Sequence, residues 1–524
     1  MAVTPARNIA FVYLAAILVL CLSGCTNANF TTGPIAGQPG APLVFVEGLN
    51  PPGFSPLVGF DISFSDSSGN YYLSSSAYTA GVLEINTGQM TSFTEPTVLG
   101  AGKTSFVGSM NPGYVTLDTA HQYEGGPNGV VAFYNPKAPT LSSALGAEEV
   151  WAADDAQFVA MGNPFGMGTY GYTQAGQWMC NSRVQIYNTN NGEWHSAYTN
   201  GCFKADEISA DPDDGIVLVA NPEENSNLVT NLNSGAFPGQ YVPSGPSSGV
   251  PTAPFISLIS TSTTDSESNY VVVKQIAFDG TNGTPNATNI LINVGSQFPL
   301  IMGGIEQPVY SPETGYFYVA VPNDLTQGEN ASNGAIAVID PKAKAFVKKF
   351  NLSNCSPDGM ALGPDGKEAL LACNSTTGPQ LINLETGAEI ASFAQSVPAP
   401  TDGASLAIYA QAGNMCDEAA YNPTTNVYVV ACQFAYNNAL VSVINAGTGL
   451  TGASFVQNLF TNPTAISAEG AAHSVSTDPI TGAVIVPLPM GDSLCPSYVS
   501  SSNVGVGCLG IWAPQGSWLQ KGAY

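Results

Sequence analysis

EQPVYSPETGYFYV, residues 306–319, opens on an acidic residue and continues through five residues into a Pro-Glu-Thr-Gly turn. A run of aromatic and β-branched residues follows the turn. Such residues favour strands, whereas Pro and Gly favour the turn between them. The stretch therefore predicts a β-hairpin.

Six other stretches repeat this pattern, and the opening position is acidic in six of the seven and histidine in one. The other stretches are FDISFSDSSGNYYL (60–73), EVWAADDAQFVAM (149–161), DEISADPDDGIVLV (206–219), DGMALGPDGKEALL (358–371), DEAAYNPTTNVYVV (417–430) and HSVSTDPITGAVIV (473–486). The shared position holds Asp61, Glu149, Asp206, Glu306, Asp358, Asp417 and His473. A hairpin repeated at this period predicts an all-β fold, a β-propeller of mostly four-stranded antiparallel blades.

The spacing of the repeats predicts seven blades and leaves eight as the alternative. Residues 222–253, rich in Asn, Ser, Gly and Pro, lie in the longest interval and predict an inserted surface loop. Residues 105–142 lie in the other long interval and have room for an eighth blade that lacks the acid. We expect the apolar strand at 43–46 to pair with the C-terminal strands and close the ring, which removes exposed edges.

The N-terminus predicts export and lipid anchoring. Arg7 precedes an apolar run, residues 9–22, that is short for a membrane span and typical of a secretory signal. Leu-Ser-Gly-Cys, ending at Cys25, resembles the bacterial lipobox, which implies cleavage before Cys25 and attachment of a diacylglyceryl group to its sulfur. A plain signal peptide cut nearby is the alternative. Thr26, rather than Asp, follows the cysteine. By resemblance to the sorting of enterobacterial lipoproteins, this implies the outer membrane, on its periplasmic or surface face.

Three segments therefore make up the expected organisation. Residues 1–24 are a lipoprotein signal peptide, residues 25–42 a flexible Pro/Gly-rich tether, and residues 43–524 a single propeller. The membrane is a partner through the lipid on Cys25.

The charge of the chain disfavours nucleic acids as partners. It carries 12 Lys+Arg against 38 Asp+Glu, a formal net charge of −26. Residues 1–24 contain one Arg and no acid, so the rest of the chain is more negative still. Such a surface repels phosphates.

Eight cysteines beyond Cys25 fall into close sequential pairs, which indicates structural disulfides of an oxidising compartment. Two of the pairs, Cys355 with Cys373 and Cys416 with Cys432, flank predicted hairpins. A zinc site is the alternative, but the Cys-x-x-Cys spacing that it usually needs is absent. The pairs are Cys180 with Cys202, Cys355 with Cys373, Cys416 with Cys432, and Cys495 with Cys508.

The shared acidic position carries the functional prediction. The first strand of a propeller blade lines the central axis, so the side chains at this position would converge and repel one another. A divalent cation would relieve this repulsion, and calcium suits a ring of carboxylates. The expected ligands are Asp61, Glu149, Asp206, Glu306, Asp358 and Asp417. His473 is a candidate proton carrier or transition-metal ligand. The alternative is that these acids hold turns or accept backbone N–H bonds.

Two stretches also resemble a known family. Residues 306–319 and the Pro-Asp-Gly-Met-Ala-Leu-Gly-Pro-Asp-Gly run, residues 357–366, resemble the metal-ligand motifs of the regucalcin/gluconolactonase propellers and the repeats of lactonase-like propellers. The resemblance implies that Glu306 and Asp358 bind a divalent cation that polarises a lactone or ester carbonyl. It makes Asp417 a third ligand or the catalytic base.

The sequence thus leaves two classes of function open. One is a binding or scaffolding propeller whose loops engage envelope proteins or glycans. The other is a metal-dependent hydrolase of lactones or related esters, with Asp417 and His473 as its candidate catalytic residues. Signatures of serine hydrolases, zinc proteases and P-loop enzymes are absent from the sequence.

Overall fold

The structure is a computed structural model of the chain. It divides into two compact units, Met1–Ile35 and Ala36–Tyr524, and all the residues that the structure describes lie in the second. These are residues 42–49, 60–75, 81–86, 97–99, 106, 127–139, 145–154, 158–160, 176–178, 182–199, 201, 204–222, 254–261, 270–278, 291–293, 304–322, 333–374, 378–393, 416–432, 440–461, 473–489, 492–496 and 507–515. No helix within these ranges is long and apolar enough to cross a membrane.

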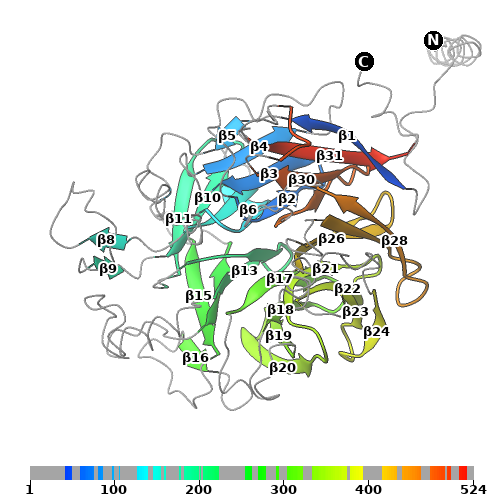
Figure 1. The fold of residues 1–524 in the computed structure, drawn as a ribbon. Coiled ribbons are helices and arrows are strands. Elements are labelled where there is room, and N and C mark those ends of the chain that lie inside the picture. The colour runs from blue at the N-terminus through cyan, green and yellow to red at the C-terminus, as the bar shows by residue number, and fades with distance from the viewer. Residues whose placement is uncertain are drawn as a thin grey trace, which may run out of the picture. The chain divides into compact units, whose positions relative to one another are not determined.

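Seven sheets of four or five strands form seven blades, as the repeats predict (Figure 1). The order of strands within each blade runs from the innermost strand outward. Blade 1 holds β2 (Ser63–Ser65), β3 (Asn70–Ser75), β4 (Gly81–Asn86) and β5 (Thr97–Leu99); blade 2 holds β6 (Val130–Pro139), β7 (Leu145–Asp154), β10 (Arg183–Asn188) and β11 (Trp194–Tyr198); blade 3 holds β12 (Ile208–Asp211), β13 (Ile216–Asn221), β14 (Phe255–Ser260), β15 (Val271–Ala277) and β16 (Leu291–Asn293).

The remaining blades are all four-stranded. Blade 4 holds β17 (Glu306–Ser311), β18 (Tyr316–Val321), β19 (Ala335–Asp340) and β20 (Ala345–Asn351); blade 5 holds β21 (Pro357–Leu362), β22 (Glu368–Cys373), β23 (Gln380–Asn383) and β24 (Glu389–Ser392); blade 6 holds β25 (Cys416–Asn422), β26 (Val427–Cys432), β27 (Leu440–Asn445) and β28 (Ser454–Phe460); blade 7 holds β29 (Ser476–Thr477), β30 (Val484–Leu488), β31 (Cys508–Pro514) and β1 (Leu43–Leu49).

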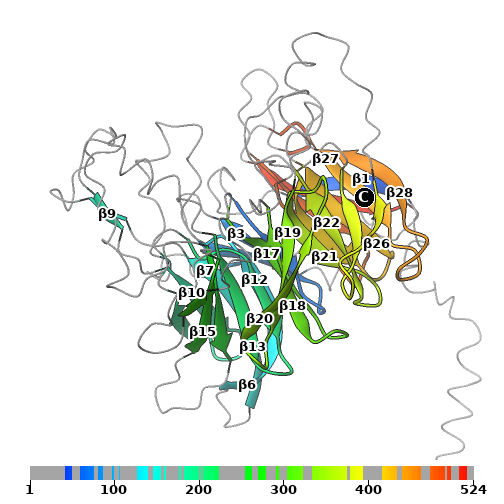
Figure 2. The ribbon, with the colours of Figure 1, turned by 90° about the horizontal axis from the view of Figure 1, so that it is seen from below.

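The innermost strands contact one another in a closed cycle that runs from β2 through β6, β12, β17, β21, β25 and β29 back to β2. In Figure 2, the neighbours β12, β17 and β21 lie side by side near the centre of the view. Closure of this cycle makes the chain a propeller rather than an open array.

The ring of blades is closed by the predicted N-terminal strand. β1 pairs antiparallel with β31, with Leu43 opposite Pro514 and Leu49 opposite Leu509. In Figure 1, the blue β1 lies beside the red β31. Blade 7 thus combines strands from the two ends of the propeller. β1 is the outer neighbour of β31 and covers its edge.

Hydrophobic cores lie between adjacent blades, because the second strand of a blade sends alternate side chains to its two neighbours. On β26, Val427 and Val429 pack toward blade 7, whereas Tyr428 and Val430 pack toward blade 5. Both faces of the strand are buried, which explains its unbroken apolar sequence. Each fully buried side chain of this size contributes about 1.5–3 kcal/mol, as an upper limit.

Tight turns join the first two strands of the blades and put a residue with positive φ at a fixed place. In blade 4, Gly315 has φ of 72° and donates its N–H to the carbonyl of Ser311 at 2.8 Å. In blade 6, Asn426 takes this place with φ of 55°. Only Gly and Asn adopt this conformation at low cost, so the repeated Gly and Asn of the sequence pattern mark these turns.

Three predicted disulfides are present, Cys355–Cys373, Cys416–Cys432 and Cys495–Cys508. The first two join the start of an innermost strand to the end of the strand beside it, in blades 5 and 6. Cys25, Cys180 and Cys202 lie outside the described residues, so their predicted roles stay predictions.

The structure differs from the sequence prediction in the N-terminal half. The alternative of an eighth blade within residues 105–142 is wrong, because the strand there, β6, is the innermost strand of blade 2. A two-stranded sheet, β8 (Phe158–Ala160) with β9 (Gly176–Trp178), follows β7 and was not predicted. β16, a fifth strand parallel to β15, also has no counterpart in the repeat pattern.

Candidate functional site

One polar residue from each blade lies at the start of the innermost strand. The backbone bonds establish the equivalence in the first three blades: Asp61 N–H donates to the carbonyl of Ser74, Asn128 N–H to that of Ala153, and Asp206 N–H to that of Ala220. We call these seven residues the ring, and the end of the propeller where they lie the ring end. The ring consists of Asp61, Asn128, Asp206, Glu306, Asp358, Asp417 and His473.

Glu149 does not belong to the ring, so its predicted place was wrong. It lies on β7, the second strand of blade 2, and is completely buried. Its carboxylate accepts hydrogen bonds from Asn135 and Trp151 at 3.0 Å each and from the Tyr270 hydroxyl. These bonds satisfy the carboxylate within the core between blades 2 and 3. The repeat pattern misplaces Glu149 because the hairpin of blade 2 has no Pro-x-x-Gly turn to mark it.

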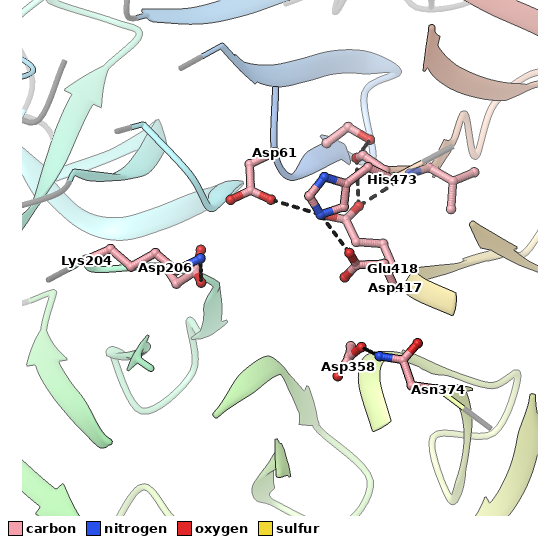
Figure 3. Close-up of polar contacts among 11 residues, drawn as sticks. Asp61, Lys204, Asp206, Asp358, Asn374, Asp417, Glu418 and His473 are labelled. Carbon is pink, nitrogen blue, oxygen red and sulfur yellow. Dashed lines mark hydrogen bonds and ion pairs between the residues drawn. The ribbon is translucent and has the colours of Figure 1, made fainter. Parts of the chain in front are cut away.

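His473 joins the acids of two neighbouring blades (Figure 3). Its Nε2 lies 2.6 Å from Asp417 Oδ2 and 3.6 Å from Asp61 Oδ1. Burial opposes a charged imidazole, but Asp417, Asp61 and Glu418 outweigh it and raise the pKa of His473 to about 10. The imidazole is therefore a cation at neutral pH that ties blade 7 to blades 6 and 1.

Two other ring acids have partners close by (Figure 3). Asp206 Oδ2 lies 2.7 Å from Lys204 Nζ, and the Asp206 side chain is only 3% exposed. Asp358 accepts a hydrogen bond from the side chain of Asn374, at the end of the adjacent strand β22. Lys204 thus neutralises Asp206, whereas Asn374 gives Asp358 a neutral hydrogen-bond donor.

A second row of residues follows the ring directly along each chain segment. Glu207 and Glu418 are both buried in this row. Glu418 Oε2 accepts hydrogen bonds from Ser474 Oγ at 2.7 Å and from the N–H of Val475 at 3.3 Å. The Ser474 hydroxyl also lies 2.7 Å from Ser63 Oγ, so this network crosses from blade 6 through blade 7 to blade 1.

The acids of different blades influence one another electrostatically. Burial raises the pKa of Glu207 well above its usual range, and the charges of Glu306, Asp206, Glu418 and Asp417 raise it further. These residues come from blades 3, 4 and 6, whose innermost strands belong to the closed cycle about the axis. Such coupling requires carboxyl groups that share a poorly solvated region.

Local irregularities of the strands aim these side chains. In blades 5 and 6, the register against the second strand shifts between Pro357 and Met360 and between Cys416 and Ala419. The ring residue and its successor therefore stand opposite a single residue, as in a β-bulge. Blade 4 has a similar shift between Glu306 and Pro308. The disulfides beside the bulges in blades 5 and 6 hold these distorted strand starts.

The predicted divalent-cation site stays a prediction. Among the described residues, no group of three or more His, Cys, Asp or Glu side chains is placed to hold a metal ion. Calcium needs six to eight oxygen ligands within about 2.6 Å. The ring acids instead stand on separate blades, with Lys204, Asn374 and His473 beside three of them.

Sequence reasoning missed Asn128, the two buried glutamates and the basic partner Lys204. The adjacent acids Asp206-Glu207 and Asp417-Glu418 were a signal in the sequence, because two acids before an apolar strand cannot both face solvent. Asn128 gave no such signal, since it precedes a strand without the usual turn.

Comparisons with known proteins give distant structural similarities and show no family. No family model matches the chain, and no curated protein matches its sequence. A chain of the crystal structure of a mitotic checkpoint complex is similar, with a TM-score of 0.44, 7% identity and coverage of 93% of this chain and 97% of that chain. A candidate 6-phosphogluconolactonase from Bacteroides fragilis has a TM-score of 0.41 and 12% identity, over 82% of this chain and 87% of that chain. Both similarities are distant.

Proposed function

We propose that this chain is a lipid-anchored binding or scaffolding propeller of the bacterial cell envelope. It would engage an envelope protein or glycan at the ring end. The observation that carries the proposal is the convergence of polar side chains from different blades, held in place by partners within the protein. A preorganised polar surface of this kind is suited to recognition, because its side chains need not be reordered on binding.

The two ends of the propeller differ in the connections that they carry. Tight turns such as 311–315 and 478–482 lie at the end away from the ring. At the ring end, the paired residues Asn221 and Phe255 are joined by residues 222–254, and residues 393–415 lead into β25. Long connections on a rigid scaffold are common sites of recognition. The ring end is therefore the proposed binding end.

The sequence and the disulfides support the proposed location. The motif ending at Cys25 supports lipid attachment and an envelope position. The three disulfides support an oxidising compartment. A Cys25→Ser variant should lose incorporation of a labelled fatty acid and leave the membrane fraction. Retention of label in this variant would contradict the proposed anchor.

Site-specific photocrosslinking in cells tests the binding end. A photoreactive residue at Ser353, exposed at the ring end before β21, should give discrete crosslinked products. The same residue at Thr386, exposed in the turn before β24 at the other end, is the matched control and should give none. Equal products from both positions, or products from Thr386 alone, would overturn the proposal.

A metal-dependent hydrolase of lactones or related esters is the second candidate, supported only by the resemblance of the Glu306 and Asp358 stretches. The raised pKa of His473 leaves its imidazole protonated, so it cannot accept a proton as a general base at neutral pH. An assay of a lactone panel with the wild type, Glu306→Gln and Asp358→Asn tests this candidate. Turnover that both variants lose would establish it.

A further inference from the structure

Two buried carboxyl groups near the axis have oxygen atoms that the described protein does not satisfy. Glu207 and Glu418 are 3% and 1% exposed. Glu207 Oε2 and Glu418 Oε1 are buried and have no hydrogen-bond partner among the described residues. Buried polar atoms are nearly always paired, so two such atoms at one place indicate a missing partner.

Glu207 and Glu418 hold the same place in blades 3 and 6, directly after a ring residue at the start of innermost strands that form a closed cycle. The pKa of Glu207, raised chiefly by burial, also responds to Glu306, Asp206, Glu418 and Asp417. The pKa of Glu418 is raised by burial and by Asp417 and Asp61, while Ser474 and His473 oppose the rise. Figure 3 shows Glu418 next to His473 and Asp417. The two glutamates therefore face one region from blades 3 and 6.

The charges around this region do not balance within the two rows. Lys204 pairs with Asp206, and His473 lies between Asp417 and Asp61. These two cations stand among seven carboxyl groups of the ring and second row. The carboxyl groups are those of Asp61, Asp206, Glu207, Glu306, Asp358, Asp417 and Glu418.

The spacing of the carboxyl groups decides which kind of cation fits. The described residues contain no cluster tight enough to hold a metal ion. An ammonium or guanidinium group instead presents several N–H donors in different directions, each reaching an oxygen at about 2.7–2.9 Å. Such a group can bridge carboxyl groups that stand too far apart to chelate one metal ion.

We propose that the centre of the ring binds an organic cation, an ammonium or guanidinium group, through the carboxyl groups of Glu207 and Glu418 with Glu306 beside them. This inference rests on the proposed binding function and names the ligand class of the same site. The cation belongs either to a free polyamine or to a Lys or Arg side chain of a protein partner.

Binding is coupled to proton release. Without the cation, burial and the neighbouring acids raise the pKa of Glu207 and of Glu418 and so favour their protonated forms. An incoming ammonium or guanidinium stabilises the carboxylate, so each carboxyl group that ionises gives its proton to the buffer and forms an ion pair. The charged groups that act on the two glutamates are those of Asp61, Asp206, Glu306, Asp417 and His473. Lys204 pairs with Asp206, and Tyr71 on β3 interacts with Glu418.

Titration calorimetry of the full chain in detergent tests this inference. The protein is titrated with spermidine, putrescine, Nα-acetyl-lysine amide and Nα-acetyl-arginine amide, each in two buffers of different ionisation enthalpy. Saturable binding with release of about one proton or more is expected from the wild type alone. Spermidine binding much more tightly than the amino-acid amides indicates a free polyamine, and comparable binding of the amides indicates a side chain of a partner.

Variants locate the site. Glu207→Gln and Glu418→Gln should each weaken binding about tenfold or more and reduce the proton release, because hydrogen bonds to charged groups are lost. Glu368→Gln, a buried glutamate of β22 outside both rows, is the matched control and should change neither value. Melting temperatures check that each variant is folded. The buffer dependence of the binding enthalpy measures proton release in the wild type, so this readout does not depend on whether a variant folds.

The outcomes separate this inference from the proposed function. Absence of binding by every amine at millimolar concentration, equal binding by the Gln variants, or displacement of the amines by low concentrations of CaCl2 would overturn the organic-cation site. If calorimetry detects no amine binding while the Ser353 crosslinks form, the binding function stands and this inference fails. Crosslinks that persist in Glu207→Gln and Glu418→Gln while both variants lose amine binding indicate a free polyamine. Loss of the crosslinks in both variants supports this inference.

Discussion

Gly359 of blade 5 lies against the backbone of Asp417 in blade 6, so closely that a Cβ atom at Gly359 would overlap the carbonyl oxygen of Asp417. Gly129 of blade 2 meets Asp206 of blade 3 in the same way. Both glycines immediately follow a ring residue. The absence of a side chain in the second row thus allows neighbouring inner strands to approach where the ring forms.

Substitution of Gly359 therefore tests the close approach of the blades. Gly359→Ala should lower the free energy of unfolding by roughly 2–3 kcal/mol, because backbone atoms must move to admit the methyl group. Gly315→Ala is the control: Gly315 has φ of 72°, but a methyl group there would meet no atom within 4 Å, so it should cost only about 1 kcal/mol of backbone strain. Urea unfolding measures both, and a Gly359→Ala cost no larger than that of Gly315→Ala would contradict the packing.

Glu368 gives a prediction about pH. This side chain is fully buried, and burial together with Asp365 raises its pKa to about 8. Because the folded state holds a proton that the unfolded state releases, this group lowers stability progressively as pH rises from about 4.5 to 8. Glu368→Gln should therefore stabilise the protein by roughly 2–3 kcal/mol at pH 7 and leave it unchanged at pH 4.

Urea unfolding at the two pH values measures this effect. Glu389→Gln, at an exposed position of β24, is the control and should alter stability by less than about 0.5 kcal/mol at either pH. A destabilisation by Glu368→Gln that is equal at both pH values would show that Glu368 is not a buried neutral acid.

The Cys416–Cys432 disulfide is expected to stabilise the start of blade 6. It spans 16 positions of the chain, and a loop of this size contributes about 3 kcal/mol in the chain-entropy model. The double variant Cys416→Ala with Cys432→Ala should lose about that much free energy of unfolding. A loss that persists when wild type and variant are compared under full reduction would assign the effect to packing instead.

The cysteines outside the described residues are also predicted to pair. Cys180 and Cys202 flank the outer strands of blade 2, β10 and β11, much as Cys416 and Cys432 flank the turn between β25 and β26. Peptide mapping of the unreduced protein by mass spectrometry should recover a Cys180–Cys202 linked peptide. Recovery of both cysteines as free thiols would refute this prediction.

The parts of the fold that could be predicted from sequence are those in which local chemistry and repetition agree. Two features predicted the hairpins: the Pro-x-x-Gly turns of blades 3, 4 and 7, and the apolar second strands. The strand at 43–46 predicted the closure of the ring. The prediction of blade 2 was wrong because Asn128 and the β6–β7 connection carry none of these sequence features. Glu149, acidic and followed by strand residues, took its place in the repeat pattern although it is a buried partner of Tyr270.

Site chemistry was less predictable because it depends on contacts between blades. The sequence predicted that the acids and His473 converge, but not that Lys204 would stand among them or that His473 would join Asp417 to Asp61. Lys204 lies two residues before Asp206 in a connection with no repeat pattern, so only the fold shows their pairing. Glu418 is buried because blades 6, 7 and 1 meet over it through Ser474 and Ser63. No local pattern encodes such a junction.

Convergence of ring residues from different blades is the claim on which the rest depends, and the titration of His473 tests it most directly. The chain has three histidines, so selective labelling allows His473 to be followed by NMR and assigned with His473→Gln. We predict a pKa of about 10 for the wild type, because Asp417 and Asp61 flank the imidazole, and a markedly lower value in Asp417→Asn. A wild-type pKa near 6.5 that Asp417→Asn leaves unchanged would contradict the ring.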